Sequence, residues 1–178
     1  TQIADLHQNV LAVKIDGATK EDYVWCFRTG FLTYAVKGRN KELYAALEDK
    51  TSGAVRGNVS NAPHISQSLI LKSFNDPEYK EQKKEKYNTL KKRYDKVKKI
   101  FKAHPEYKEY FEPLPYNSGY FMCVKMKKDS EEIRQVLLSR YSTGIIAMGE
   151  LIRVAFSGTP FDKLEKLYQN LYEACKEQ

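Results

Sequence analysis

Two early segments of the chain have the apolar pattern of buried strands. Residues 10–15 are mostly apolar and are followed by an Asp-Gly pair that favours a turn. Residues 29–36 are rich in β-branched and aromatic residues, which favour strands. The pattern therefore predicts two strands, joined by a connection that carries Lys20 and Arg28.

The next segment changes to a helical period. Leu43, Tyr44 and Leu47 share one face of a helix that begins near position 40. The polar Arg-Gly-Asn sequence at Arg56 predicts a turn, and the Ser-Asn-Ala-Pro sequence after it predicts a second helix that ends near Phe74. Two helices are therefore expected after the second strand.

A long and strongly charged helix is predicted at residues 77–104, beginning with a proline in its first turn. A narrow apolar stripe recurs along it at spacings of three and four: Tyr87, Leu90, Tyr94, Val97 and Phe101. Residues 78–102 contain eleven basic and four acidic side chains, an excess equal to the net charge of +7 of the whole chain. The positive charge of the protein therefore belongs to this helix.

The last part of the chain alternates between strand and helix patterns. It predicts strand, helix, strand, strand and helix at residues 119–126, 129–140, 143–148, 151–156 and from 159 onward. Asp129 and Glu132 are spaced as in a capping box, and a Thr-Pro-Phe-Asp sequence at Thr159 predicts the start of the last helix. One face of that helix is expected to point inward: Phe161, Leu164, Leu167, Leu171 and Ala174. The fold class is therefore α/β, with a small α+β unit after the long connecting helix.

Composition limits the classes of protein that fit the chain. It has 178 residues, 42% of them hydrophobic, and no apolar run approaches the ~18–20 residues that cross a membrane. No charged and apolar leader opens the sequence. The three cysteines and three histidines are scattered, with no metal-ligand spacing. We therefore expect a soluble protein of a reducing compartment, the cytoplasm, without a metal site or a membrane partner.

Three basic residues are candidates for chemistry. Lys20 lies on a turn after an apolar strand, where partial burial or a neighbouring cation would make it a Schiff-base nucleophile. Arg28 lies among aromatic residues and offers a bidentate fork to a phosphate or a carboxylate. Arg153 lies in a strand that is apolar on both sides, where an unpaired charge is costly. Its partner is either Glu150 or the carboxylate of a ligand.

These candidates occur in segments that match a known family. The segments are Thr19-Lys20 with Phe27-Arg28-Thr29-Gly30-Phe31, Arg56-Gly57-Asn58-Val59-Ser60-Asn61-Ala62-Pro63, Pro115-Tyr116-Asn117-Ser118-Gly119-Tyr120-Phe121 and Ile152-Arg153-Val154-Ala155. In this order they resemble the C-terminal half of a pyridoxal-phosphate-dependent aminotransferase of the aspartate aminotransferase-like, fold type I family. The resemblance covers essentially the whole chain.

The resemblance implies a role for each candidate. Lys20 would bind the cofactor, pyridoxal 5'-phosphate, and move a proton between the substrate α-carbon and the cofactor. Arg28 would hold the cofactor phosphate, and Arg153 the α-carboxylate of the substrate. Arg56 would bind the side-chain carboxylate of a dicarboxylic substrate across a dimer, or be a solvated loop residue. The implied reaction is transamination between a 2-oxo acid and an amino acid, either aspartate, glutamate or an aromatic one.

The resemblance also implies an organisation into domains. Residues 1–76 would end the large cofactor-binding domain, 77–104 would form the connecting helix, and 105–178 the small domain. The rest of the pocket would come from the missing N-terminal half of the enzyme and from a second copy in a homodimer. Two positions depart from the family pattern, because Cys26 replaces the glycine of a Gly-x-Arg motif and Gly17 stands where many members have serine.

Two other interpretations stay open. The lysine-rich helix would suit a basic module that binds nucleic acid or an acidic surface. Its tyrosines, however, fall at core spacing instead of alternating with basic residues as stacking platforms. A non-catalytic relative or remnant is the other interpretation. The resemblance favours a transaminase fragment that holds the reactive lysine and has no nucleic acid as partner.

Overall fold

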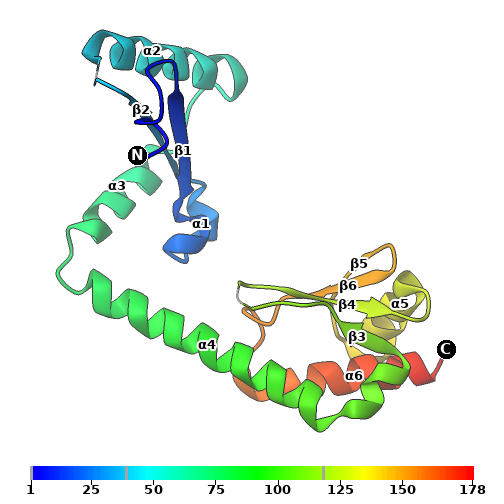
Figure 1. Ribbon diagram of the computed structural model, residues 1–178. Helices are drawn as coiled ribbons and strands as arrows, with labels where there is room; N and C mark the ends of the chain where they lie inside the picture. The colour runs from blue at the N-terminus through cyan, green and yellow to red at the C-terminus, as the bar shows by residue number, and fades with distance from the viewer. Residues whose placement is uncertain (1, 39, 118) are drawn as a thin grey trace. The chain divides into compact units, whose positions relative to one another are not determined.

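The computed structural model describes residues 2–38, 40–117 and 119–178, and the chain forms two compact units, Thr1–Lys83 and Lys84–Gln178. Both units mix helices and strands (Figure 1). The predicted α/β class is therefore confirmed at this level. Arg39 and Ser118, which belong to the expected large-domain segment and to the third family motif, lie outside the described residues, as does Thr1.

The first unit is built on an antiparallel pair of strands. Its elements are β1 (Leu11–Gly17), α1 (Ala18–Glu21), the 3-10 turn η1 (Trp25–Phe27), β2 (Gly30–Val36), α2 (Lys41–Asn58), α3 (His64–Phe74) and the first turn of α4 (Tyr79–Ala103). The register pairs Gly17 with Gly30, and the Ala18 amide donates to the Thr29 carbonyl at 3.2 Å. A Cβ atom on Gly30 would lie 3.0 Å from the carbonyl oxygen of Asp16, so the close approach of the strands favours glycine here.

The helix α2 is longer than the sequence pattern predicts. The predicted turn at Arg56 is wrong, because α2 continues to Asn58. The Asn58 side-chain amide donates to the carbonyl of Ala54 at 2.8 Å, and Arg56 Nη1 donates to Ser60 Oγ at 3.0 Å. These local hydrogen bonds satisfy groups at the helix end, so the polar residues prolong the helix and the turn falls at Ser60, whose φ is 68°.

The first unit leaves most of its apolar side chains exposed. The described residues of this unit include three buried apolar side chains: Ala4, Ala18 and Ile70. The register places Ile15 opposite Leu32, and Val13 lies on the same face of the hairpin. Ile15 is nevertheless 79% exposed and Val13 50% exposed. An apolar face of this kind normally contacts further polypeptide.

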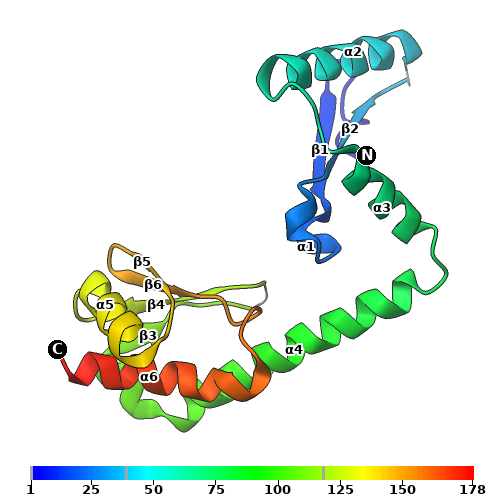
Figure 2. The same ribbon diagram turned by 180° about the vertical axis from the view of Figure 1, so that it is seen from behind.

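The second unit has a sheet and a continuous core. Its elements after α4 are η2 (Pro105–Glu109), β3 (Phe111–Pro113), β4 (Met122–Met126), α5 (Ser130–Tyr141), β5 (Ile146–Met148), β6 (Leu151–Val154), η3 (Phe161–Lys163) and α6 (Leu164–Lys176). The sheet is antiparallel, in the order β3-β4-β6-β5, and α6 lies alongside the C-terminal part of α4 (Figure 2). The core joins one face of the sheet to α4, α5 and α6, and its largest fully buried side chains are Tyr107, Tyr168, Phe111 and Phe156.

Helix α5 begins where its capping signal predicts. The Asp129 carboxylate accepts hydrogen bonds from the amides of Glu131 and Glu132, both at 2.9 Å. The predicted cap of the last helix is wrong, because Thr159 Oγ1 donates instead to the carbonyl of Ala155 at 3.2 Å. A 3-10 turn fills the gap, so α6 starts at Leu164.

Two further differences concern packing at the edges of the second unit. Phe161 is predicted to point inward but is 50% exposed, because it lies in the 3-10 turn before α6. Strand β3 falls within the proline-containing connection, where the sequence predicts no strand. Its residue Pro113 is tolerated because β3 is the edge strand of the sheet.

Candidate functional site

The structure brings Lys20 and Arg28 to the same end of the β1–β2 hairpin. Lys20 lies in α1, three residues after Gly17, and Arg28 lies two residues before Gly30. Because Gly17 pairs with Gly30, the amine and the guanidinium belong to one connection between paired strand ends. Both residues are exposed, so their charged groups are accessible to a ligand.

Arg28 combines an unusual backbone conformation with a side chain that makes few contacts. Its φ is 51°, in the left-handed region that non-glycine residues seldom adopt. Its Nη1 donates to the carbonyl of Trp25 at 3.3 Å, the one hydrogen bond that the guanidinium makes to a described residue. The remaining N–H groups of the fork are available to an anion such as a phosphate.

The local backbone accommodates both the residues present and the family's own residue at the second of the two departures from the family pattern. Cys26 lies in η1 with an exposed side chain, and its φ is not positive, so the backbone does not require glycine there. Gly17 has a φ of −144°, and a Cβ atom on it would meet nothing within 4 Å. The family's serine would therefore fit at this position without displacing a neighbour.

The turn that carries Lys20 is tied to the first turns of α4. The Tyr79 hydroxyl donates to the Asp22 carboxylate, and Lys83 Nζ lies 3.3 Å from Asp22 Oδ1 and 3.2 Å from the Tyr79 oxygen. Burial lowers the pKa of Lys83, but hydrogen bonds to Tyr79 and Asp22 together outweigh it and raise this pKa. The lysine therefore stays protonated and keeps the carboxylate paired.

Sequence reasoning missed this cluster. Asp22 and Tyr79 are separated by 57 positions, so no local pattern connects them. The weak signal is the spacing of four between Tyr79 and Lys83, which places both side chains on one face of a helix.

Arg56 makes only local contacts in the described structure. It lies in the last turn of α2 and is exposed. Its Nη1 donates to Ser60, at 3.0 Å to the hydroxyl and 3.4 Å to the carbonyl. These contacts hold the guanidinium at the helix end without burying it.

Arg153 lies in the second unit, on the face of the sheet opposite the core. Its neighbours Ile152 and Val154 point into the core, so the arginine points away from it. The guanidinium carbon lies 4.3 Å from the centre of the Phe121 ring, a cation–π contact. Its Nε is buried and has no hydrogen-bond partner among the described residues.

Glu150 does not pair with Arg153. Its carboxylate instead lies 3.4 Å from the ammonium of Lys125. Of the two partners considered for Arg153, the acid nearby in the sequence is therefore engaged elsewhere. The guanidinium remains suited to an external carboxylate.

The groups present in the first unit fit pyridoxal phosphate. An amine suits its aldehyde, and a guanidinium with free N–H groups suits its phosphate. Both lie on one connection and both are accessible. Within the described ranges, no group of three metal-ligating side chains occurs, and no helix is long and apolar enough to cross a membrane.

Comparison with known proteins relates the chain to aminotransferase structures. An aminotransferase of Anaerococcus prevotii matches 98% of the chain at a TM-score of 0.75 and 22% identity, over 41% of its own length. The second match is a Methanococcus jannaschii protein that is described as similar in its active site to kynurenine aminotransferases. It matches 90% of the chain at a TM-score of 0.67 and 18% identity, over 41% of its own length. Tyrosine aminotransferase of Leishmania infantum matches 97%, with a TM-score of 0.68, 14% identity and 43% of its length.

The matches are structural ones. Comparisons with models of protein families and with curated proteins give no match. The chain spans about two fifths of the length of the solved structures that it matches. Their agreement over nearly all of the chain shows that these 178 residues adopt part of the fold of a fold type I aminotransferase.

Proposed function

We propose that this chain is part of a pyridoxal-phosphate-dependent transaminase. It would exchange an amino group between a 2-oxo acid and an amino acid, either aspartate, glutamate or an aromatic one. The observation that carries the proposal is the placement of Lys20 and Arg28 at one end of a hairpin in a chain with a partial aminotransferase fold. When bound, pyridoxal phosphate supplies an electron sink for the substrate α-carbon.

The residues of this chain would divide the work of binding and proton transfer. The Lys20 amine would anchor the cofactor and carry the proton to and from the substrate α-carbon. Arg28 would hold the phosphate with its free N–H groups, and Asp22 would fix the turn between them through Tyr79 and Lys83.

Substrate binding would fall to arginines outside this turn. Arg153 would bind the α-carboxylate, which would give its guanidinium the anionic partner that it lacks among the described residues. Arg56 would bind a side-chain carboxylate across a homodimer. In this proposal, residues 1–76 end the large domain, 77–104 connect the domains, and 105–178 form the small domain.

The first unit would be completed by further polypeptide. The hairpin face that holds Val13 and Ile15 is apolar and exposed, and both outer edges of this two-stranded sheet lack a strand partner in the described chain. Such a surface is typical of a sheet that continues. The N-terminal half of the enzyme is the proposed partner, so the chain alone is expected to bind the cofactor incompletely and to be inactive.

Reductive labelling tests the role of the lysine without needing activity. Pyridoxal phosphate is mixed with the chain, the product is reduced with borohydride, and peptide mass spectrometry locates the label. We expect Lys20 to be labelled well above exposed lysines such as Lys14. Equal labelling of the lysines would refute the proposal.

A second comparison tests the role of Arg28. Pyridoxal, which has no phosphate, serves as the matched probe. The preference of Lys20 for the phosphorylated probe should disappear in Arg28→Ala and persist in Arg56→Ala. Retention of the preference in Arg28→Ala would remove the arginine from the proposed phosphate site. A visible spectrum that responds to amino acids would show that the chain is active alone.

A further inference from the structure

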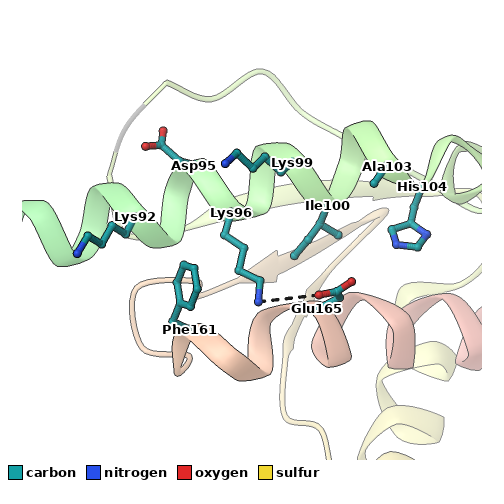
Figure 3. Close-up of a pocket in the computed structure, with 9 residues that line it drawn as sticks. All are labelled: Lys92, Asp95, Lys96, Lys99, Ile100, Ala103, His104, Phe161 and Glu165. Atoms are coloured by element: carbon teal, nitrogen blue, oxygen red, sulfur yellow. Dashed lines mark ion pairs between the residues drawn. The ribbon is translucent and has the colours of Figure 1, made fainter.

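A groove on the second unit lies between α4 and the start of α6. Its volume is about 470 Å³. Figure 3 shows side chains from α4, from η3 and from α6 around it. We call this surface the α4–α6 groove, and its lining residues are Lys92, Asp95, Lys96, Lys99, Ile100, Ala103, His104, Phe161 and Glu165.

The rim of the groove on α4 is basic. Lys92, Lys96 and Lys99 follow a helical spacing of four and three, so they form a row about 10 Å long on one face of α4. Asp95 does not neutralise this row, because its carboxylate lies 2.8 Å from Lys91. Within the described chain, neither Lys92 nor Lys99 has an acidic partner at ion-pair distance.

The floor of the groove is apolar. Ile100 and Ala103 lie on α4 and Phe161 lies in the turn before α6, with the Lys96 side chain between the Phe161 ring and Ile100 (Figure 3). The Lys96 ammonium lies 4.6 Å from the centre of this ring and 3.9 Å from Glu165. Half of the Phe161 side chain stays exposed, although the core of the unit is complete without it.

We infer that the α4–α6 groove binds a short acidic segment of a partner protein. An apolar side chain of the segment would rest on Phe161 and the floor, and flanking carboxylates would pair with Lys92 and Lys99. The apolar floor favours a peptide over a nucleic acid, because phosphate contacts alone would need only the lysines. This inference does not depend on the proposed transaminase function.

Fluorescence anisotropy on the full chain tests the inference with defined probes. The main probe is a labelled hexapeptide, Glu-Glu-Leu-Phe-Glu-Glu. Three comparison probes isolate its features: the same peptide with Gln for Glu, the same peptide with Gly for Leu and Phe, and a single-stranded oligonucleotide. We expect the main probe to bind more tightly than each of the others.

Paired charge reversals test whether the lysines of the groove are responsible. The variant Lys92→Glu/Lys99→Glu should bind the main probe about tenfold more weakly, a change of about 1.4 kcal/mol. The matched control Lys80→Glu/Lys84→Glu changes the net charge equally, at exposed positions of α4 outside the groove. Its affinity for the main probe should stay within about twofold of that of the unaltered chain. Equal weakening by both variants would mean diffuse attraction and would overturn the inference.

Two further variants test the contribution of the groove floor and the independence of peptide binding from the proposed active site. Phe161→Ala should weaken the main probe but leave the Gly-containing probe unchanged. Lys20→Ala should change the affinity for neither peptide, which keeps this test distinct from that of the transaminase function. Failure of the main probe to bind, an equal effect of Phe161→Ala on both peptides, or tighter binding of the oligonucleotide would overturn the inference.

Discussion

Replacement of Arg153 by methionine should stabilise the second unit. The arginine leaves a buried Nε–H without a partner among the described residues, and such a group costs about 1–3 kcal/mol. Methionine removes this group and retains an apolar stem. The substitution also removes the contact with the Phe121 ring, which contributes about 0.5–1 kcal/mol. The difference predicts that the free energy of unfolding rises by about 1 kcal/mol.

Urea unfolding provides the assay, because the second unit has a signal of its own. Circular dichroism of the tyrosines around the core reports mainly this unit, whereas Trp25, the single tryptophan, lies in the first unit and is 69% exposed, so its fluorescence changes little on unfolding. Arg153→Met should shift the tyrosine transition to higher urea, with its slope unchanged. Arg153→Lys, which keeps the charge but lacks the Nε–H, serves as the control. A fall in stability of Arg153→Met would refute the argument that the residue is retained for ligand binding.

Four substitutions test other parts of the structure. Asp129→Ala removes the acceptor of two amide hydrogen bonds at the start of α5 and should lower the free energy of unfolding in urea by about 1 kcal/mol. Phe111→Ala empties a fully buried position and should cost about 3–5 kcal/mol, seen as a lowered thermal midpoint. The Arg134 guanidinium lowers the pKa of Glu131 from 4.5 to about 2. The ion pair therefore stabilises the fold fully above pH 4.5, and this stabilisation is lost as the pH falls to about 2. Glu131→Gln should remove this pH dependence from a curve of stability against pH. Gly17→Ser supplies α1 with a capping hydroxyl and should raise stability in urea by about 0.3 kcal/mol.

Elements with local signals could be predicted from the sequence, and elements with distant partners could not. The start of α5 follows from the chemistry of Asp129, whose contacts all lie within one turn. The end of α2 is missed because Arg56 and Asn58 make helix-end hydrogen bonds that compete with the expected turn. Strand β3 is missed because three residues ending at Pro113 become a strand only by pairing with β4.

The same distinction applies to the candidate site. Lys20 and Arg28 could be proposed from the sequence because their segments resemble motifs of a known family. Arg153 could be selected because a charge in an apolar strand requires an explanation. The contact of Arg153 with Phe121 and the hold of Asp22 on the lysine-bearing turn depend on tertiary packing, so only the structure reveals them.

The two units differ in how much apolar surface each buries by itself. The second unit buries a continuous core on one face of its sheet, so on the other face it can keep the Nε–H of Arg153 without a hydrogen-bond partner among the described residues. The first unit leaves Val13 50% exposed and Ile15 79% exposed, and burial of the exposed parts would contribute about 1–2 kcal/mol each. A polypeptide that covered this face would stabilise the hairpin by several kcal/mol in total, because binding to the folded state stabilises it. The contact that completes the first unit would therefore also order the hairpin end that carries Lys20, which couples assembly of the fold to assembly of the site.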